Sequence, residues 1–415
     1  MVTNWARNVS FGAARFEEPE SVDELRRLVA SSSRLKALGV GHSFSPIADT
    51  TGDLVSLARL PKTITIDEDQ ARVTVSAAVT YGELGPHLHQ AGYALANLAS
   101  LPHISVAGAC LTGTHGSGRT TGCLATQVAA IELITGDGDV VTLNRDSAEF
   151  SGAVVNLGAL GVVTTLSLDL EPTYEVRQYV YENLPAGELD SHLPGIFASG
   201  YSVSLFTDWR GPVISQVWLK LREGTGPGPG PDWLGARIAD GPRHPVPGQS
   251  PVNCTTQLGV PGPWHERLPH FKLDFTPSAG QELQTEYLLP ADQALSAIGA
   301  IESIAGQVSP VLQISEIRTV AADDLWLSPA WQRDSIALHF TWIDDVAAVM
   351  PVIEAVEEKL LPLGARPHWG KLFIASPDVI ARQYDRLPDF LTLMTRYDPT
   401  GKFRNTFIDR YMQLG

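Results

Sequence analysis

Two glycine-rich segments constrain this chain more than any other feature of its sequence. The first spans residues 37–44 and contains Gly39-Val-Gly41-His42-Ser43, and the second spans residues 105–118. Glycine permits positive φ angles and close backbone approach, so that consecutive N–H groups can point into one concavity and bind an anion. Serine and threonine hydroxyls in both segments add further donors. Two such loops predict a site for a pyrophosphate bridge rather than for a single phosphate.

Neither segment matches a more familiar nucleotide or nucleophile motif. No G-x-G-x-x-G opens a helix, and the Gly-Lys-Ser/Thr ending of a P-loop is missing. The stretch from Gly41 to Ser45 lacks the closing glycine of a nucleophile elbow, which argues against a serine hydrolase. For each loop taken alone, an ordinary glycine turn remains the alternative.

The composition excludes several classes of function. Of 415 residues, 30 are basic and 46 acidic, and this net charge of −16 argues against a nucleic-acid partner. The three cysteines, Cys110, Cys123 and Cys254, form no CxxC or Cys/His pattern, so neither a disulfide framework nor a metal site is expected. The N-terminal stretch lacks the pattern of a signal peptide, and no window approaches the roughly 18 apolar residues of a membrane span. We therefore expect a soluble, cytoplasmic protein with no membrane partner.

Strands and helices alternate in the first ~170 residues. Ser21-Val-Asp-Glu24 is a capping box that predicts a helix after Ser21. Another helix is predicted over residues 81–92, and strands over 35–40, 63–66, 73–79 and 162–170. The turn Thr135-Gly-Asp-Gly-Asp139 predicts a hairpin over residues 129–143.

Longer strands are predicted beyond Pro172. They cover residues 201–206, 214–221, 283–288, 311–319 and 335–342, with amphipathic helices over 290–305 and 344–361. Residues 224–251 are rich in Gly and Pro, which predicts a loop. This succession favours an antiparallel sheet covered by helices on one face.

Two of these strands carry polar residues at the spacing of one sheet face. Glu316 and Arg318 are two residues apart, as are His339 and Thr341. If the strands are neighbours, the four side chains converge, and a buried carboxylate and guanidinium must then pair or serve a ligand. A solvent-facing sheet with ordinary ion pairs is the alternative. The histidine His270, beside the Pro-rich region, is expected to be solvated.

Taken together, these motifs resemble the FAD-binding domain of the vanillyl-alcohol-oxidase superfamily and, within it, the alditol (xylitol) oxidase family. The resemblance covers essentially the whole chain. It rests on both glycine loops and on Glu316-Ile-Arg318, His339-Phe-Thr341, His368-Trp-Gly-Lys371 and Lys402-Phe-Arg-Asn405. It implies an α+β fold with a PCMH-type FAD-binding domain in residues 1–175. A cap domain with an antiparallel sheet covered by helices would follow in 176–370, and residues 371–415 would return to the FAD-binding domain.

The resemblance also implies that FAD is the cofactor and is covalently attached through His42. In that family the histidine of the G-x-G-H-S loop is joined to the 8α-methyl carbon of the flavin, a step that needs a neutral, nucleophilic imidazole. The other FAD contacts that it implies come from Ala37, Leu38, Gly39, Val40, Gly41, Ser43, Ser100, Ser105, Gly108, Thr112, Gly113, Thr114, His115, Val163 and His368.

By the same resemblance, the expected activity is oxidation of the terminal C1 hydroxyl of polyols such as xylitol and sorbitol. Hydride would pass to flavin N5, the product would be the aldehyde, and O₂ would be reduced to H₂O₂. Arg318 and Lys371 are expected to stabilise the alkoxide, and Glu316 to orient the substrate and hold Arg318. The resemblance implies substrate contacts from Ser100, Glu316, Arg318, Thr341 and Lys371, and the strand pattern adds Gln284 and His339.

Three functions therefore stay open at this point. The first is an alditol oxidase, a monomer whose partners are a small polyol and O₂. The second is an aldonolactone oxidase or dehydrogenase of the L-gulono-1,4-lactone type. The third is a flavin-binding module without redox turnover, against which the intact polar set argues.

Overall fold

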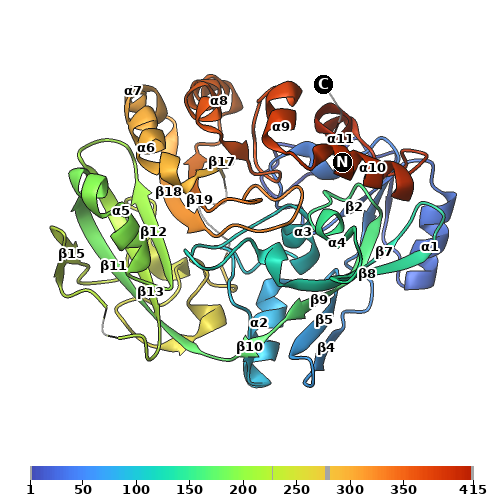
Figure 1. Cartoon of the computed structure of the whole chain (residues 1–415), viewed down its shortest axis with the longest axis horizontal. Helices are drawn as coiled ribbons and strands as arrows, with labels where there is room; N and C mark the ends of the chain where they lie inside the picture. The colour runs from blue at the N-terminus through green and yellow to red at the C-terminus, as the bar shows by residue number, and fades with distance from the viewer. Residues whose placement is uncertain (1, 227, 276–280, 413–415) are drawn as a thin grey trace.

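The computed structural model describes residues 2–226, 228–275 and 281–412. Its strands form two groups, which Figure 1 shows on opposite sides of the molecule. Two sheets built from residues 15–169 lie on the right, and one large antiparallel sheet lies on the left with helices above it. Helices segregated to one face of an antiparallel sheet define the predicted α+β class, which is confirmed.

The first group contains a parallel and an antiparallel sheet. In the parallel sheet, β1 (Arg15–Glu17) and β2 (Leu35–Leu38) both pair with β3 (Asp53–Ser56). The antiparallel sheet has the order β4-β5-β9-β7-β8, formed by β4 (Ile64–Asp67), β5 (Arg72–Ser76), β7 (Val128–Ile134), β8 (Val140–Asn144) and β9 (Val162–Asp169). Around it lie α1 (Val22–Ser31), α2 (Tyr81–Gln90), α3 (Val106–Leu111), α4 (Phe150–Ala153) and the short pair of β6 (Tyr93–Ala94) and β10 (Glu171–Pro172).

The predicted cap of helix α1 forms in a modified way. The Ser21 side chain accepts a hydrogen bond from the Glu24 backbone N–H at 3.2 Å, as the motif predicts. The Glu24 carboxylate, however, accepts from the backbone N–H of Glu20 at 2.8 Å, one residue before the cap. The complete capping box is instead at α2, where Thr80 and Glu83 bond reciprocally.

The second group is a ten-stranded sheet in the order β14-β15-β11-β13-β12-β18-β19-β17-β20, with β16 beside β11. Its long strands are β11 (Glu175–Pro185), β12 (Ser202–Thr207), β13 (Val213–Arg222), β17 (Leu283–Pro290), β18 (Leu312–Val320) and β19 (Ser335–Trp342). The short ones are β14 (Asp232–Trp233), β15 (Ala236–Ile238), β16 (Gly262–Pro263) and β20 (Arg366–Pro367). The prediction that residues 224–251 form a loop is therefore wrong in part, because β15 lies in this stretch and pairs with β11 of the large sheet.

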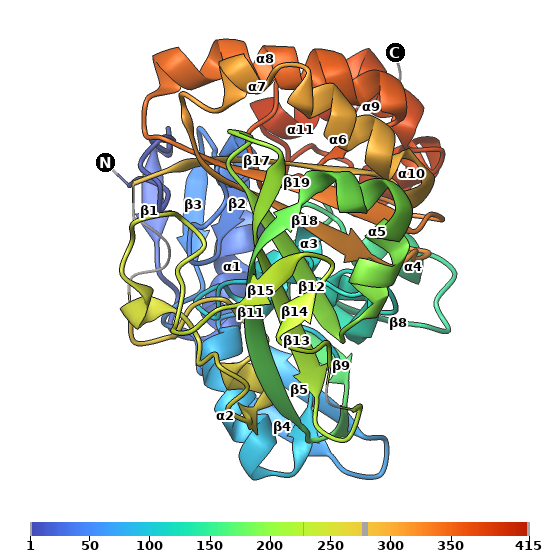
Figure 2. The same cartoon turned by 90° about the vertical axis from the view of Figure 1, so that its left-hand side faces the viewer.

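Helices α5 (Leu189–Ala198), α6 (Ala294–Glu302), α7 (Ala305–Val308) and α8 (Val346–Leu360) accompany this sheet, and Figure 2 shows α6, α7 and α8 above β17–β19. Side chain alternation gives the sheet two different faces. Leu205, Ile317, Leu338 and Tyr287 face one another across β12, β18, β19 and β17 and share a hydrophobic core with the helices. The adjacent row contains Phe206, Glu316, His339 and Glu286 and points to the opposite face.

The C-terminal segment packs against the first group of strands. Helices α9 (Pro377–Gln383), α10 (Leu387–Tyr397) and α11 (Thr406–Tyr411) supply Ile380, Phe390 and Ile408 to the core that also contains Leu25 and Val55. Two large cores therefore stand out among the described residues, one beneath the helices of the large sheet and one formed mostly by the two ends of the chain, to which Trp264, Leu268 and Leu325–Leu327 also contribute.

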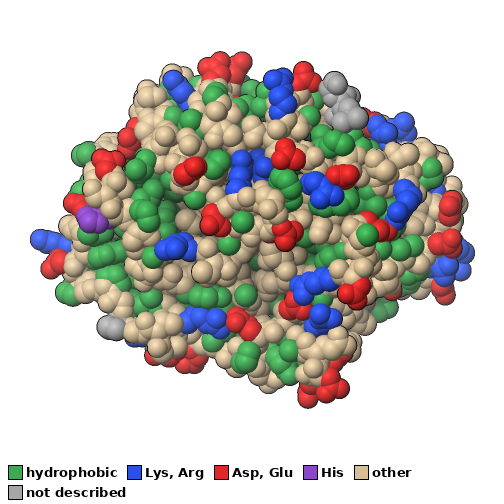
Figure 3. Space-filling model, in the orientation of Figure 1, with side chains coloured by type: hydrophobic (Ala, Val, Ile, Leu, Met, Phe, Trp, Pro, Cys, Tyr) green, Lys and Arg blue, Asp and Glu red, His purple; other side chains and the backbone are tan. Residues whose placement is uncertain are grey.

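The surface carries charges of both signs. On the face shown in Figure 3, acidic and basic side chains are interspersed. Within the described residues, no helix has both the length and the apolar character that crossing a membrane requires.

Candidate active site

The two glycine-rich loops lie against each other. Gly41 adopts a φ of +73°, and its carbonyl accepts a hydrogen bond from the Trp5 N–H at 2.8 Å. A Cβ atom at Gly39 would lie 2.9 Å from the Ser105 hydroxyl oxygen, closer than real Cβ contacts allow. Only glycine therefore lets the backbone of the first loop approach the start of the second.

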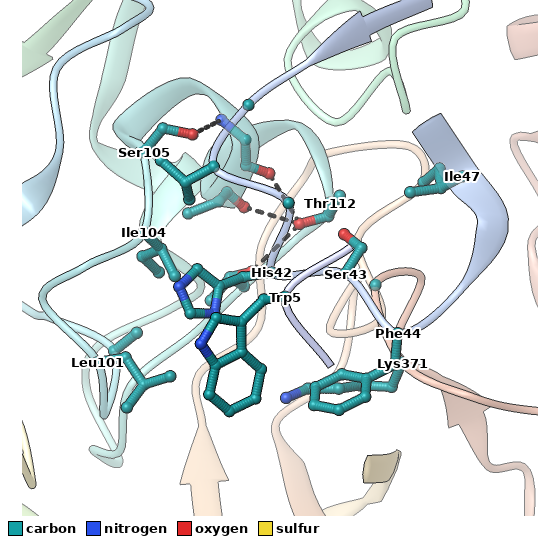
Figure 4. A pocket seen from close by; sticks show the side chains of 18 of the residues that line it. Trp5, His42, Ser43, Phe44, Ile47, Leu101, Ile104, Ser105, Thr112 and Lys371 are labelled. Atoms are coloured by element: carbon teal, nitrogen blue, oxygen red, sulfur yellow. Dashed lines mark hydrogen bonds between the residues drawn. The ribbon is translucent and has the colours of Figure 1, made fainter. Parts of the chain in front are cut away.

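The second loop begins with helix α3, which is capped by one of the predicted site residues. The Ser105 hydroxyl accepts from the Gly108 N–H at 3.3 Å, and the Thr112 hydroxyl donates to the Gly108 carbonyl at 2.9 Å. Gly113 then reverses the chain with a φ of +69°. Figure 4 shows Ser105 and Thr112 on this loop beside the first loop, which carries His42 and Ser43.

A cavity of about 300 Å³ runs between these loops and the polar face of the large sheet. It is lined by all of the site residues expected from the sequence except Gly113. A Cβ at Gly113 would lie 2.9 Å from Pro329 Cδ, so this glycine shapes the turn behind the loop. The sites expected for a cofactor and for a substrate are thus parts of one continuous cavity.

His42 lies in this cavity in a form suited to nucleophilic chemistry. Burial lowers the pKa of His42 to about 4, so its imidazole is neutral at neutral pH. The indole of Trp5 stacks on it with a centroid distance of 5.1 Å and an interplanar angle of 27° (Figure 4). The stack holds the ring in one orientation on the cavity wall.

The predicted convergence of polar strand residues is observed. Strands β18 and β19 are neighbours, and Glu316 lies directly opposite His339. On the other side of β19, Glu286 of β17 lies opposite the same histidine. All three side chains are at least 90% buried, which excludes the alternative of an ordinary solvent-facing sheet.

Arg318 pairs chiefly with a residue that the sequence did not single out. Its guanidinium donates to the Glu286 carboxylate at 2.6 Å, whereas Glu316 Oε1 lies 3.5 Å from Arg318 Nε. Ala337 stands opposite Arg318 on β19, and its short side chain leaves room for the guanidinium to cross that strand. Glu316 thus lies within ion-pair distance of Arg318, as expected, but Glu286 is the nearer partner. Arg318 also reaches the Ser100 hydroxyl at 3.4 Å.

A second polar row lies next to the first and centres on Gln284. Gln284 is opposite Thr341, and its side chain oxygen accepts from His339 Nε2 at 3.1 Å and from Lys371 Nζ. Lys371 Nζ also lies 5.2 Å above the ring of Phe44. Burial lowers the pKa of Lys371, so its ammonium group loses a proton more readily than that of an exposed lysine.

The charges of the site divide between permanent ions and neutral histidines. Burial lowers the pKa of His339 and of His368 to about 3, so both rings are uncharged at neutral pH. Burial alone raises the pKa of Glu316, but Arg318 and His270 lower it well below its usual value. The cavity therefore presents fixed carboxylates and cations beside neutral donors and acceptors.

Sequence reasoning missed three residues of this site. Glu286 could have been found, because it follows Gln284 by two positions on a predicted strand. Trp5 and His270 carry no such signal, since each reaches the cavity from an irregular segment. The prediction that His270 is solvated is wrong: it is 5% exposed, and its backbone N–H donates to the Ser100 carbonyl at 3.0 Å.

The described residues fit an elongated dinucleotide such as FAD. Cβ atoms at Gly39 and Gly108 would fall within 3 Å of Ser105 Oγ, so the cradle depends on backbone rather than side chains. Apolar residues, including Leu157 and Val163, line the part of the cavity beyond the loops. A cradle of this kind with an apolar end suits a pyrophosphate with a flat base attached.

Comparisons with known proteins agree that the chain has an FAD site. A family model described as an FAD binding domain matches residues 13–144, and one described as D-arabinono-1,4-lactone oxidase matches residues 279–411. An alditol oxidase of Streptomyces sp. (strain IKD472 / FERM P-14339) is 50% identical over 410 residues, 98% of either chain. The L-gulonolactone oxidase of Bos taurus is 26% identical and covers 98% of this chain and 97% of its own.

Solved structures resemble this chain in fold. A solvent-stable cholesterol oxidase superposes with a TM-score of 0.79 at 13% identity, covering 99% of this chain and 97% of that one. A chitooligosaccharide oxidase gives 0.75, also at 13% identity, and covers 97% and 93%. From the near full-length match at 50% identity, together with the FAD-binding domain model, the chain belongs to the alditol oxidase family of the vanillyl-alcohol-oxidase-type FAD-binding superfamily.

Proposed function

We propose that this protein is an FAD-dependent alditol oxidase that acts on the terminal C1 hydroxyl of polyols such as xylitol and sorbitol. The products would be the aldehyde and H₂O₂. One observation carries the proposal: a buried row of polar side chains, Glu286, His339 and Glu316, faces the glycine loops across one cavity. The 50% identity to an alditol oxidase over nearly the full chain adds to this support.

The lining of the cavity suits a ligand made of hydroxyl groups. Each hydroxyl of a polyol both donates and accepts a hydrogen bond. Glu316 offers an acceptor, Arg318 and Lys371 offer donors, and Ser100 and Thr341 offer both. A site that pairs each hydroxyl in this way discriminates strongly against ligands that lack one.

FAD would be held by the backbone of residues 38–43 and 112–115, with Ser105 and Gly108 beside the pyrophosphate and Val163 near the adenine. His368 would contact the flavin, and His42 would be its covalent attachment point, which its neutral imidazole supports. The chemistry that bound FAD supplies is two-electron oxidation of an alcohol carbon, with the electrons passing on to O₂.

The cations of the chain would act on the substrate oxygen. As the C1 hydroxyl loses its proton, negative charge grows on its oxygen, and Arg318 and Lys371 would stabilise that charge within a buried site. Glu286 would keep Arg318 in place through the 2.6 Å ion pair. Glu316 would accept a hydrogen bond from a substrate hydroxyl and so fix the chain of the polyol.

We also propose an FAD-binding domain of residues 1–175 and 371–415 and a cap domain of residues 176–370. The two large cores support this in the main, although Trp264, Leu268 and Leu325–Leu327 pack into the first core. We extend the proposal to a cytoplasmic monomer that meets only a small polyol and O₂. Gel filtration with light scattering would test the oligomeric state.

Covalent attachment is tested by acid precipitation. The wild-type protein is expected to retain its yellow colour in the pellet, and the flavin should map to a peptide that contains His42. His42→Ala should release the flavin, whereas His87→Ala, which changes an exposed histidine of α2, should not. A wild-type supernatant that takes up the colour would contradict the link.

The lactone alternative keeps some support, because a D-arabinono-1,4-lactone oxidase model matches residues 279–411. Initial rates of O₂ consumption with xylitol, sorbitol and L-gulono-1,4-lactone separate the two functions. We expect xylitol and sorbitol to be oxidised with H₂O₂ formation, and the lactone to be the poorer substrate by at least tenfold in kcat/KM. The reverse order would establish the lactone function instead.

A further inference from the structure

Along the polar face, a buried chain of hydrogen bonds leads from the cavity across β12 to β13. Glu316 Oε1 lies 2.8 Å from His270 Nε2, and His270 Nδ1 lies 3.2 Å from Lys220 Nζ. Lys220 is 1% exposed and lies on β13, two strands away from Glu316. Phe206 and Trp218 pack edge-on against the His270 ring and close the chain off from water.

The partners of Lys220 determine which nitrogen of His270 carries the proton. An ammonium group has three N–H donors and no acceptor. Lys220 Nζ has three neighbours able to accept: the Leu268 carbonyl, the Pro269 carbonyl at 3.1 Å and His270 Nδ1. His270 Nδ1 must therefore be the bare, accepting nitrogen, and in the neutral ring Nε2 carries the hydrogen and donates it to Glu316.

The opposite arrangement is disfavoured by the same contacts. Burial lowers the pKa of Lys220 to about 7, so a neutral amine has to be considered. A neutral amine could accept from His270 Nδ1–H, but His270 Nε2 would then be bare. Two acceptors, Nε2 and a carboxylate oxygen, would face each other at 2.8 Å inside the protein. An imidazolium beside a neutral amine would keep both bonds, but burial lowers the pKa of His270 to about 4. The contacts therefore favour a charged Lys220 beside a neutral His270.

We propose that Lys220 and His270 are positioning residues for Glu316. His270, held by Lys220, occupies Oε1 of the carboxylate and leaves Oε2 as the acceptor offered to the substrate. Oε2 accepts no hydrogen bond from the part of the chain that the structure describes. Such an acceptor favours a group that can donate, such as a free hydroxyl of an open-chain polyol, over an ether or carbonyl oxygen at the same position. This inference rests on the proposed alditol oxidase function.

Kinetics of His270 variants test the inference. His270→Leu removes the donor, and we expect KM for xylitol to rise at least tenfold, as for loss of a charge-assisted hydrogen bond, while kcat stays within threefold. His270→Gln offers an amide N–H to Glu316 and should recover most of the affinity. His265→Leu is the matched control, because that partly buried histidine stands on the same segment and contacts His89 and Trp264 instead.

A double-mutant cycle separates positioning from a merely structural role. In a Glu316→Gln background, His270→Leu should change KM less than twofold, because the carboxylate that it positions is gone. An additive effect on KM, or an unchanged KM in His270→Leu with its full FAD absorbance, would overturn the inference. Failure of the wild-type protein to oxidise any alditol would instead refute the proposed function, and this inference with it. Lys220→Met is a second probe and should raise KM in the same direction.

Discussion

Glu357 gives the structure a stability that depends on pH in a calculable way. It lies on the buried side of α8 and is 3% exposed. Its Oε1 accepts from the Tyr287 hydroxyl at 3.0 Å and from the Ile374 backbone N–H at 2.9 Å, three residues after Lys371. Burial raises the pKa of Glu357 from 4.5 to about 7.

The sign and size of the effect follow from that shift. Between pH 4.5 and 7 the carboxyl keeps its proton in the folded state and loses it in the unfolded state. The stability that it contributes is complete below the unfolded pKa and is lost as the pH rises through the folded one. A pKa difference of about 2.5 corresponds to roughly 3.4 kcal/mol in total, of which about 2.5 kcal/mol should disappear between pH 5 and pH 8.

Urea unfolding of Glu357→Gln against wild type measures this loss. The substitution keeps the size of the side chain and its carbonyl acceptor but cannot ionise. We expect the free energy of unfolding of the variant, relative to wild type, to increase by about 2.5 kcal/mol from pH 5 to pH 8. Glu358→Gln is the control, since Glu358 is exposed on the same helix and its substitution should shift nothing. A difference between Glu357→Gln and wild type that is independent of pH would refute the reasoning.

Three further substitutions test individual contacts of the cavity. Glu286→Gln leaves the buried Arg318 without its main partner, so it should lower the free energy of unfolding by about 3 kcal/mol, and a loss below 1 kcal/mol would contradict the ion pair. Lys371→Met removes a buried cation from the expected alkoxide and should slow anaerobic flavin reduction at least 100-fold at saturating xylitol, which stopped-flow absorbance measures. Trp5→Leu removes the ring stacked on His42, so a larger share of the flavin should escape into the acid supernatant than from wild type, and an equal share would show that the stack is dispensable.

Much of the fold could be predicted because its signals are local. The alternation along residues 311–319 and 335–342 gave both central strands of the large sheet within two residues at each end. The turn at residues 135–139 gave a hairpin, whose Thr135 N–H indeed bonds to the Asp139 carbonyl at 2.9 Å. Edge strands such as β15 escaped prediction, because three residues in a Gly- and Pro-rich stretch show no periodicity.

The residues of the site also divide into those with a local sequence signal and those without one. Residues on predicted strands or glycine loops could be assigned to one cavity from spacing and resemblance, as for Glu316 and His42. Partners that other segments supply could not be assigned to the cavity from the sequence. The Arg318–Glu286 pair crosses an intervening strand, and His270 enters from a loop held by the Ser100 carbonyl. Such contacts depend on strand order, which a single sequence does not fix.

The central claim is that an alditol bound on the polar face of β17, β19 and β18 is oxidised by an FAD that the glycine loops hold. Anaerobic mixing of the purified protein with xylitol, followed by flavin absorbance, tests it most directly. We predict rapid and complete bleaching in wild type, and a rate at least 100-fold lower in Arg318→Met at equal FAD content. A flavin that stays oxidised in wild type, or one that Arg318→Met reduces at the wild-type rate, would contradict the account.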